Sequence, residues 1–213
     1  MKALEQFHFE PAKCKEEIEA FGKLLKAKQR LVERDEIQPF FESHPHLAAF
    51  LGSYDLDVGP ANRLAFKYDI LGDFEADLVL GNYEQRKYCL VEFEDCNDKS
   101  LFVKSGQKAT KEWGKRFEHG FSQLVDWFYA LDDTRGTLRF AQDFGYGYVR
   151  FSGMLIIGQS AGLDESERNR LAWRTEKVVV NSNPVYCLTF DDLFGGLCRR
   201  FNNYTSVSHF EVP

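Results

Sequence analysis

The chain has 213 residues, of which 44% are hydrophobic and 28% charged, and its formal net charge at pH 7 is −6. This composition excludes a disordered chain, and the length suffices to bury a core without disulfide or metal staples. The acidic balance disfavours a protein that coats nucleic acid over its whole surface, but it allows a local basic groove.

The cysteine pattern indicates a reducing compartment. Five cysteines are widely spaced, with no C-x-x-C pair, which also disfavours a zinc site. No signal-peptide core and no run of about 18 apolar residues is present. We therefore expect a cytoplasmic protein with no membrane partner.

In chain order, hydrophobic spacing predicts helices over residues 12–33 and 36–52, then a meander of strands at 62–71, 75–81 and 87–95. A helix at 117–133 follows, with Phe117, Phe121, Leu124, Val125, Phe128 and Leu131 as its core face. The apolar strand at 147–159 suits a sheet covered on both faces. Asp164 and Glu167 predict a capped helix at 165–179, followed by a strand at 185–190 and a final helix capped by Asp191 or Asp192.

The second and third strands bring acidic residues together. A turn centred on Glu84 and Gln85 places Asp77 directly opposite Glu92, with Cβ atoms roughly 4.5–5.5 Å apart. Glu94 lies on the same face because side chains two residues apart on a strand point the same way. These three carboxylates predict either shared protons or a hard cation, for which Mg²⁺ or Mn²⁺ fits better than zinc.

Such an ion can lower the pKa of water and stabilise charge on a phosphate during in-line attack, which indicates hydrolytic chemistry. The alternative interpretation is a solvated acidic face or an edge-strand guard. The following segment favours the first interpretation, because residues 99–119 hold six basic residues against Glu112 and Glu118. Cations beside acids suit a phosphodiester substrate, so we expect DNA contacts from Lys99, Lys104, Lys108, Lys111 and His119.

Gln123 lies on the helix that follows, beside its apolar stripe, with Trp127 four residues later. A glutamine at that position can orient water or phosphate. No G-x-x-x-x-G-K-[ST] loop and no G-x-S-x-G elbow occurs, which disfavours an intrinsic ATPase and a serine hydrolase.

The chain resembles the Shedu-type anti-phage nuclease domain, a branch of the PD-(D/E)XK nuclease superfamily. The resemblance spans roughly residues 36 to 200 and rests on EADLVL, LVEFEDCNDKSLFVKSG, GFSQLVDW, RFSGMLIIGQ and VYCLTFDDLF, in the family's order. It implies an α/β core with a mixed central sheet flanked by helices. It also makes Asp77 the motif aspartate, Glu92 the first acid of the (D/E)-x-K signature and Gln123 the glutamine of the RecB-like branch.

The resemblance further implies an acid on the first helix of the core, for which Glu36 and Glu42 are candidates and Glu42 is preferred. One departure stands out: the signature lysine position holds Glu94, so the chain reads E-x-E. An acid there is compatible with catalysis in some restriction enzymes of the superfamily, and Lys104 is the candidate for a replacement cation.

The resulting hypothesis is a Mg²⁺- or Mn²⁺-dependent DNA endonuclease or nickase of phage defence, with Asp77, Glu92, Glu94 and Gln123 as catalytic residues and Glu42 assisting the metal. Residues 1–35 are predicted to be a helical extension and residues 36–213 the nuclease domain, in a homo-oligomer (dimer or tetramer). Two alternatives stay open: a catalytically inactive nuclease-fold protein that binds DNA, and a scaffold with solvated acids.

Overall fold

The computed structural model describes residues 4–70, 72, 74–107 and 109–207. Within them, the chain forms in order β1 (Glu5–Gln6), α1 (Pro11–Ala27), the π-helical turn η1 (Glu33–Ile37), α2 (Gln38–Ser43), α3 (Pro45–Phe50), the 3-10 turn η2 (Leu51–Tyr54), β2 (Arg63–Ile70), β3 (Phe74–Asn82), β4 (Lys87–Phe93), β5 (Phe102–Val103), β6 (Glu112–Trp113), α4 (Lys115–Asp133), α5 (Leu138–Phe144), β7 (Arg150–Ile156), α6 (Glu165–Lys177), β8 (Val179–Val180), β9 (Asn183–Leu188) and α7 (Phe190–Val207).

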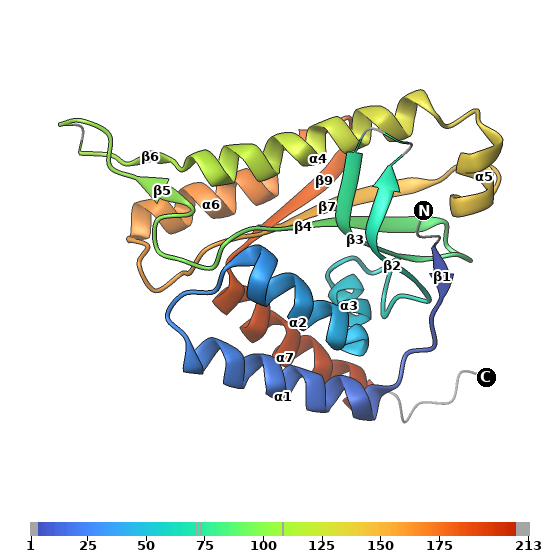
Figure 1. Cartoon of the computed structure of the whole chain (residues 1–213), viewed down its shortest axis with the longest axis horizontal. Coiled ribbons are helices and arrows are strands. Elements are labelled where there is room, and N and C mark those ends of the chain that lie inside the picture. Colours follow the sequence, from blue (N-terminus) through green and yellow to red (C-terminus); the bar gives the residue numbers. More distant parts are fainter. Residues whose placement is uncertain (1–3, 71, 73, 108, 208–213) are drawn as a thin grey trace.

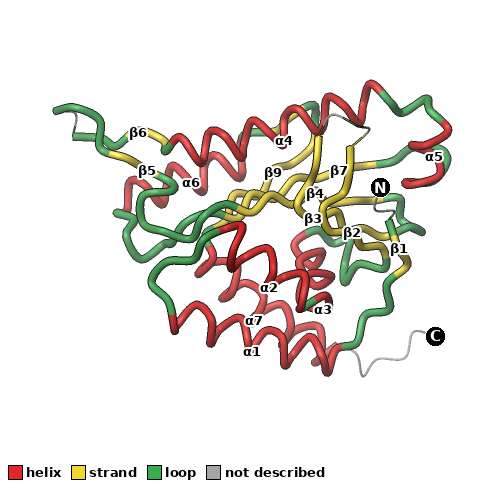
Figure 2. Tube along the Cα trace, in the orientation of Figure 1, coloured by secondary structure: helices red, strands yellow, loops and turns green. Residues whose placement is uncertain are grey.

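A mixed sheet in the order β1-β2-β3-β4-β7-β9-β8 forms the centre of the fold. The β2–β3–β4 meander is antiparallel, whereas β4–β7 and β7–β9 are parallel pairs. The sheet lies between two helical layers, α4 and α6 on one face and α1, α2, α3 and α7 on the other (Figures 1 and 2). The predicted α/β class, with a mixed central sheet flanked by helices, is confirmed.

Each face of the sheet has its own apolar core. Leu78, Val91 and Ile156 pack toward α1, α2, α3 and α7, together with Cys89, which strand alternation places on the face opposite to Glu92. Val79, Leu90 and Leu155 pack toward α4, α5 and α6. Because both faces are covered, β4 is buried along its whole length, so its two charged residues are also removed from water.

The predicted elements are found, with local corrections. The helix expected at 36–52 is broken at His44, because Pro45 lacks the N–H that would continue it and instead begins α3. Val125 is 37% exposed and Trp127 only 1%, so the core stripe of α4 includes Trp127 rather than Val125. Leu71, at the end of the expected strand, lies outside the described residues.

The predicted N-terminal cap is found at α6 but not at α7. Asp164 and Glu167 form the predicted capping box of α6. At α7 the cap is Thr189 rather than an aspartate: its Oγ1 accepts the Asp192 N–H at 3.1 Å, and both aspartates lie in the first turn. Short elements without a periodic signal, β1, β5, β6, β8 and α5, were not predicted.

The N-terminal helix shares the core of the rest of the chain, since Cys14, Ile18 and Phe21 of α1 pack in the same cluster as Leu193 and Leu197 of α7. The predicted boundary at residue 35 stays a prediction. Among the described residues, no helix combines the length and the apolar character needed to cross a membrane. All five cysteines carry free thiols, and four of them are buried.

Candidate active site

The acids of β3 and β4 meet at one end of the meander. The paired residues of β3 and β4 end with Leu78 opposite Val91. This pairing confirms the register predicted from the turn and places Asp77 at the next position of β3. The backbone N–H of Phe93 donates to Asp77 Oδ2 at 2.9 Å, so the Asp77 carboxylate lies against the end of β4. A Cβ atom placed on Gly120 of α4 would lie 3.5 Å from Glu92 Cγ and 3.3 Å from Glu94 Cγ, so both glutamates face α4 and lie on the same side of the sheet, as predicted.

All three carboxylates are buried. Asp77 is 7% exposed, Glu92 5% and Glu94 2%. A solvated acidic face is therefore ruled out for them, and each needs compensation from hydrogen bonds, cations or protons.

A fourth acid, Glu33 of η1, completes this group. Gln38 Nε2 donates to Glu33 Oε1 at 3.0 Å and to Asp77 Oδ1 at 2.7 Å, so one amide group links the two carboxylates. Arg116 Nη1 of α4 lies 3.6 Å from Glu33 Oε2 and 2.8 Å from Glu94 Oε2, which links Glu33 to the strand acids from the other side. We refer to Glu33, Asp77, Glu92 and Glu94 as the acidic cluster.

The two helix acids expected from the sequence do not take this place. Glu36 accepts the Val32 N–H at 2.8 Å and pairs with Lys28, away from the cluster. Glu42 is exposed on α2, one turn beyond Gln38, and no hydrogen bond or ion pair among the described residues joins it to the cluster. Glu33 lies in a single π-helical turn, which has no hydrophobic periodicity that would have signalled it.

The chain positions Glu33 by joining two distant segments. Leu31 and Cys96 exchange backbone hydrogen bonds of 3.1 and 3.0 Å, which ties the segment before Glu33 to the segment after Glu94. The buried Asp95 reinforces this connection, since its Oδ1 accepts the Glu33 N–H at 3.0 Å and its Oδ2 lies 3.3 Å from Arg116 Nη2.

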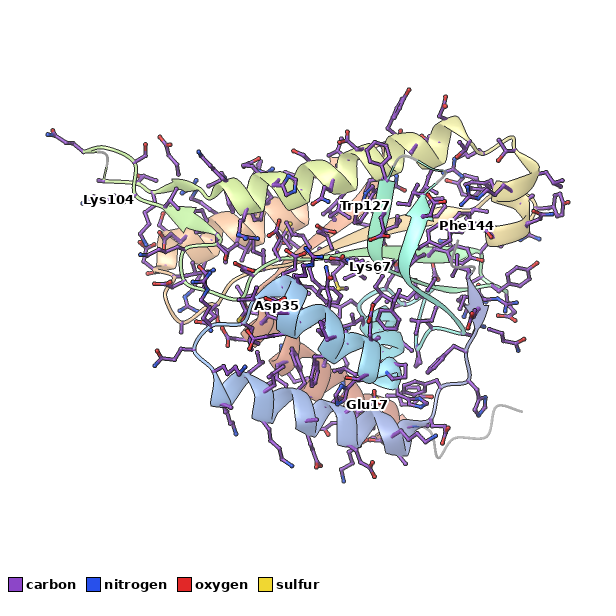
Figure 3. All side chains as sticks on the ribbon, in the orientation of Figure 1. Glu17, Asp35, Lys67, Lys104, Trp127 and Phe144 are labelled. Atoms are coloured by element: carbon purple, nitrogen blue, oxygen red, sulfur yellow. The ribbon has the colours of Figure 1, made fainter. Side chains whose placement is uncertain are left out.

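Lys67 of β2 approaches the cluster from the neighbouring strand. Its Nζ lies 2.6 Å from Asp77 Oδ1 and 3.8 Å from Glu75 Oε1. Sequence reasoning missed Lys67, although a signal existed: the β2–β3 register that pairs Phe66 with Leu78 and Tyr68 with Ala76 sets Lys67 across from Asp77. Lys104, the expected replacement cation, instead lies at the end of the β5–β6 arm, far from Lys67 in the view of Figure 3.

Burial and mutual repulsion dominate the electrostatics. Loss of hydration raises the pKa of Glu33 to about 7, with further contributions from the charges of Asp77 and Glu94. Burial, followed by the charges of Asp77, Glu33 and Glu94, raises the pKa of Glu92 well above its ordinary value. Burial also raises the pKa of Glu94, although Arg116 opposes that change. No hydrogen bond or ion pair to the Glu92 carboxyl group occurs among the described residues.

This donor set suits a hard cation, because it offers only carboxylate oxygens around a buried glutamate that makes no hydrogen bond or ion pair among the described residues. In the structure, Lys67 pairs with Asp77 and Arg116 pairs with Glu94. In the described part of the chain, no three His, Cys, Asp or Glu side chains are arranged to hold an ion. An ion in the cluster would therefore share these carboxylates with Lys67 and Arg116.

Gln123 lies on α4, three residues after Gly120, whose position on the helix is close to Glu92 and Glu94. Its Oε1 atom is buried and has no hydrogen-bond partner among the described residues. A buried acceptor without a partner is costly, so this atom is available to a water or ligand donor. Trp127 packs in the apolar core between the sheet and α4.

The predicted DNA-contacting residues are spread over two regions. Lys99 and Arg30 line a pocket of about 390 Å³ with Arg116 and Asp95, directly beside the cluster. His119 is exposed on α4, and its charge lowers the pKa of Glu94. Lys104 is exposed on the β5–β6 arm, which projects from the body of the molecule (Figures 1 and 3).

The two remaining lysines of the prediction are Lys111 and Lys108. Lys111 forms an ion pair with Glu167 Oε1 at 2.8 Å, so it fixes the base of the arm to α6. Lys108 lies outside the described residues.

Comparison with known protein families is consistent with this geometry. The family model described as "Shedu protein SduA, C-terminal" matches residues 31–194, which is most of the chain. The chain belongs to this Shedu family. The matched segment begins at Leu31, just before Glu33, and includes the complete acidic cluster of the Shedu domain. No curated protein matches the chain.

Membership of the Shedu family points to anti-phage defence, and a nuclease is the plausible activity for its α/β core. The buried acids of this Shedu domain agree with such a role. They need a compensating charge, and the adjoining pocket is lined by Arg30, Lys99 and Arg116 together with Asp95 and Asp98.

Proposed function

We propose that this Shedu domain is a metal-dependent DNA endonuclease or nickase of phage defence. The observation that carries the proposal is the buried acidic cluster, in which Glu92 has carboxylate neighbours and makes no hydrogen bond or ion pair among the described residues. Asp77, Glu92 and Glu94, with Glu33, are the residues that would hold Mg²⁺ or Mn²⁺. When bound, the ion supplies positive charge at the scissile phosphate and lowers the pKa of water.

The chain's own residues perform the remaining tasks. Arg116 and Lys99 bind the phosphodiester backbone where their pocket opens beside Glu94. Gln123 orients the attacking water through its free Oε1 acceptor. Gly120 lets α4 approach Glu92 and Glu94 closely, which excludes bulk water and strengthens the electrostatic interactions there.

DNA also contacts the β5–β6 arm in this proposal. The arm extends past α4 and α6, and Lys104 is exposed on it. Together with the pocket of Arg30, Lys99 and Arg116, the arm provides a local basic path on an acidic protein. Because a domain of this size offers limited groove surface, we propose that it acts as a homo-oligomer, which mass photometry can test.

Incubation of supercoiled plasmid with the protein and Mg²⁺ or Mn²⁺ tests the activity. We expect nicked or linear products from the wild type, none from the Asp77→Ala variant and wild-type products from Asp126→Ala, an exposed aspartate of α4. Identical plasmid profiles for the wild type and Asp77→Ala over a range of both metals would rule out the proposed activity.

A second candidate is a nuclease-fold protein that binds DNA without cutting it. The ion pairs Lys67–Asp77 and Arg116–Glu94 favour it, because they compensate the charges of two of the acids without a metal ion. Thermal melting discriminates between the two candidates. Saturating Mn²⁺ raises the melting temperature of a metal-dependent nuclease, whereas it does not stabilise a protein whose acids stay paired with Lys67 and Arg116. DNA retardation without cleavage or metal stabilisation would support the second candidate.

A further inference from the structure

Lys67 stands out by its contact with the acidic cluster. Its Nζ lies 2.6 Å from Asp77 Oδ1, and its side chain is 28% exposed. The same Asp77 carboxylate accepts Gln38 Nε2 on Oδ1 and the Phe93 N–H on Oδ2. Three donors therefore fix the orientation of Asp77, and Lys67 is the one that carries a charge.

The backbone of Lys67 is unusual as well. Its φ is +50°, a left-handed conformation that non-glycine residues rarely adopt. It occurs in the middle of β2, between the regular pairs Phe66–Leu78 and Tyr68–Ala76. The register is the same on both sides, so no residue is inserted, and the distortion is confined to the position across from Asp77. Strain of this kind concentrates at functional sites.

Lys67 and Arg116 compensate different acids of the cluster. Arg116 Nη1 lies 2.8 Å from Glu94 Oε2, whereas Lys67 pairs with Asp77. In Figure 3, Lys67 lies near the centre of the view and Lys104 at the end of the arm. Lys67 is thus the lysine that the described contacts join to the cluster.

We propose that Lys67 is the positioning lysine of this site, supplied by the neighbouring strand β2. This inference rests on the proposed nuclease function. The ammonium holds Asp77 in one orientation and compensates part of its charge, both before and after a divalent cation binds. Lys67 therefore weakens metal binding at this carboxylate while it keeps the carboxylate oriented for the reaction.

The test compares three variants of the full chain. Lys67→Met removes the charge and keeps most of the side-chain volume, Lys67→Arg keeps the charge, and Glu75→Gln is the matched control, because Glu75 is the other acid near Lys67 and is mostly exposed. Mn²⁺ affinity is measured by calorimetry, and plasmid cleavage is measured as kcat and KM.

We expect Lys67→Met to bind Mn²⁺ about tenfold more tightly, because the nearby positive charge is gone. Its kcat falls about 10²-fold with little change in KM, since the orientation of Asp77 matters during the reaction. Lys67→Arg recovers a substantial part of kcat, and Glu75→Gln resembles the wild type in both measurements.

Three results would overturn the inference. The first is a Lys67→Met variant with wild-type kcat, and the second is a Lys67→Arg variant as impaired as Lys67→Met. The third is a Lys67→Met variant that loses Mn²⁺ binding and has a lowered melting temperature, because that result would mean that Lys67 is purely structural. If the wild type itself does not cleave, the proposed function fails, and Mn²⁺ affinity alone decides about Lys67. Tighter binding by Lys67→Met then supports the inference, and unchanged binding refutes it.

Discussion

Gly120 lies directly over Glu94: a Cβ atom on this glycine would stand 3.3 Å from Glu94 Cγ and 2.7 Å from Leu155 Cδ1. The absence of a side chain lets the helix close over the acidic cluster. Gly120→Ala should therefore push against Glu94 and Leu155 and misplace the carboxylate. We expect weaker Mn²⁺ binding, slower cleavage and a loss of about 1–3 kcal/mol of stability, partly offset by about 1 kcal/mol of helix propensity.

Gly195→Ala in α7 is the matched control, because the added Cβ would meet only the flexible end of Arg199 at 3.5 Å. Calorimetric Mn²⁺ titration and urea unfolding measure both variants. If Gly120→Ala binds Mn²⁺ as the wild type does, the close approach of α4 has no part in shaping the site.

Replacement of Glu92 by glutamine should stabilise the metal-free protein and abolish cleavage. Burial and the charges of Asp77 and Glu33 raise the pKa of Glu92, so ionisation is costly there, and a neutral amide of similar shape avoids that cost. We expect a gain of about 1–2 kcal/mol, roughly 3–6 °C in melting temperature for a chain of this length. Calorimetric melting without metal measures it, and a lower melting temperature would mean that Glu92 has an essential structural partner.

The metal-free protein should lose stability as the pH rises through the window set by Glu33. Its pKa is about 7 in the folded state against 4.5 ordinarily, so the folded state binds more protons than the unfolded state between these values. The free energy of unfolding then falls by on the order of 2–3 kcal/mol across that window. The raised pKa of Glu92 adds a loss of the same sign and extends it upward.

Glu33→Gln should flatten this pH dependence, whereas Glu42→Gln, at an exposed position of α2, should keep it. Urea unfolding monitored by circular dichroism over this pH range provides the measurement. If the Glu33→Gln variant keeps the wild-type slope of the free energy of unfolding against pH, a group other than Glu33 titrates in this window.

Lys104 on the arm should contribute to DNA affinity through its charge alone. Lys104→Gln should weaken binding to any DNA sequence and reduce the slope of log K against log salt concentration by about 1. Lys26→Gln is the control, because Lys26 is exposed on α1, in the helical layer on the other face of the sheet. Fluorescence anisotropy over a salt series would show equal slopes for both variants if the arm does not touch DNA.

The sequence predicted the parts of the site that local geometry determines. Asp77 and Glu92 belong to one hairpin, so a short turn and the two-residue strand repeat were sufficient to set them side by side. Gln123 could be placed because one helix carries both it and the core stripe.

The remaining residues reach the site through tertiary structure. Glu33 depends on backbone pairing between Leu31 and Cys96, and Arg116 enters from the first turn of α4, neither of which has a local pattern. Glu42 is the acid that the resemblance favours on the first helix of the core, but it is exposed on α2, and Glu33, in the turn before that helix, lies at the cluster instead. Lys67 could have been found if register had been applied to the β2–β3 hairpin as well.

Opening of the Leu31–Cys96 bridge would separate Glu33 from the other acids of the cluster without global unfolding. Two hydrogen bonds, of 3.1 and 3.0 Å, hold the segment that carries Glu33 against the end of β4. Local openings of this size require less free energy than global unfolding. Amide hydrogen exchange at Leu31 and Cys96 should therefore report how often the fourth acid separates from the other three, and an ion shared by all four should slow the exchange at both amides together.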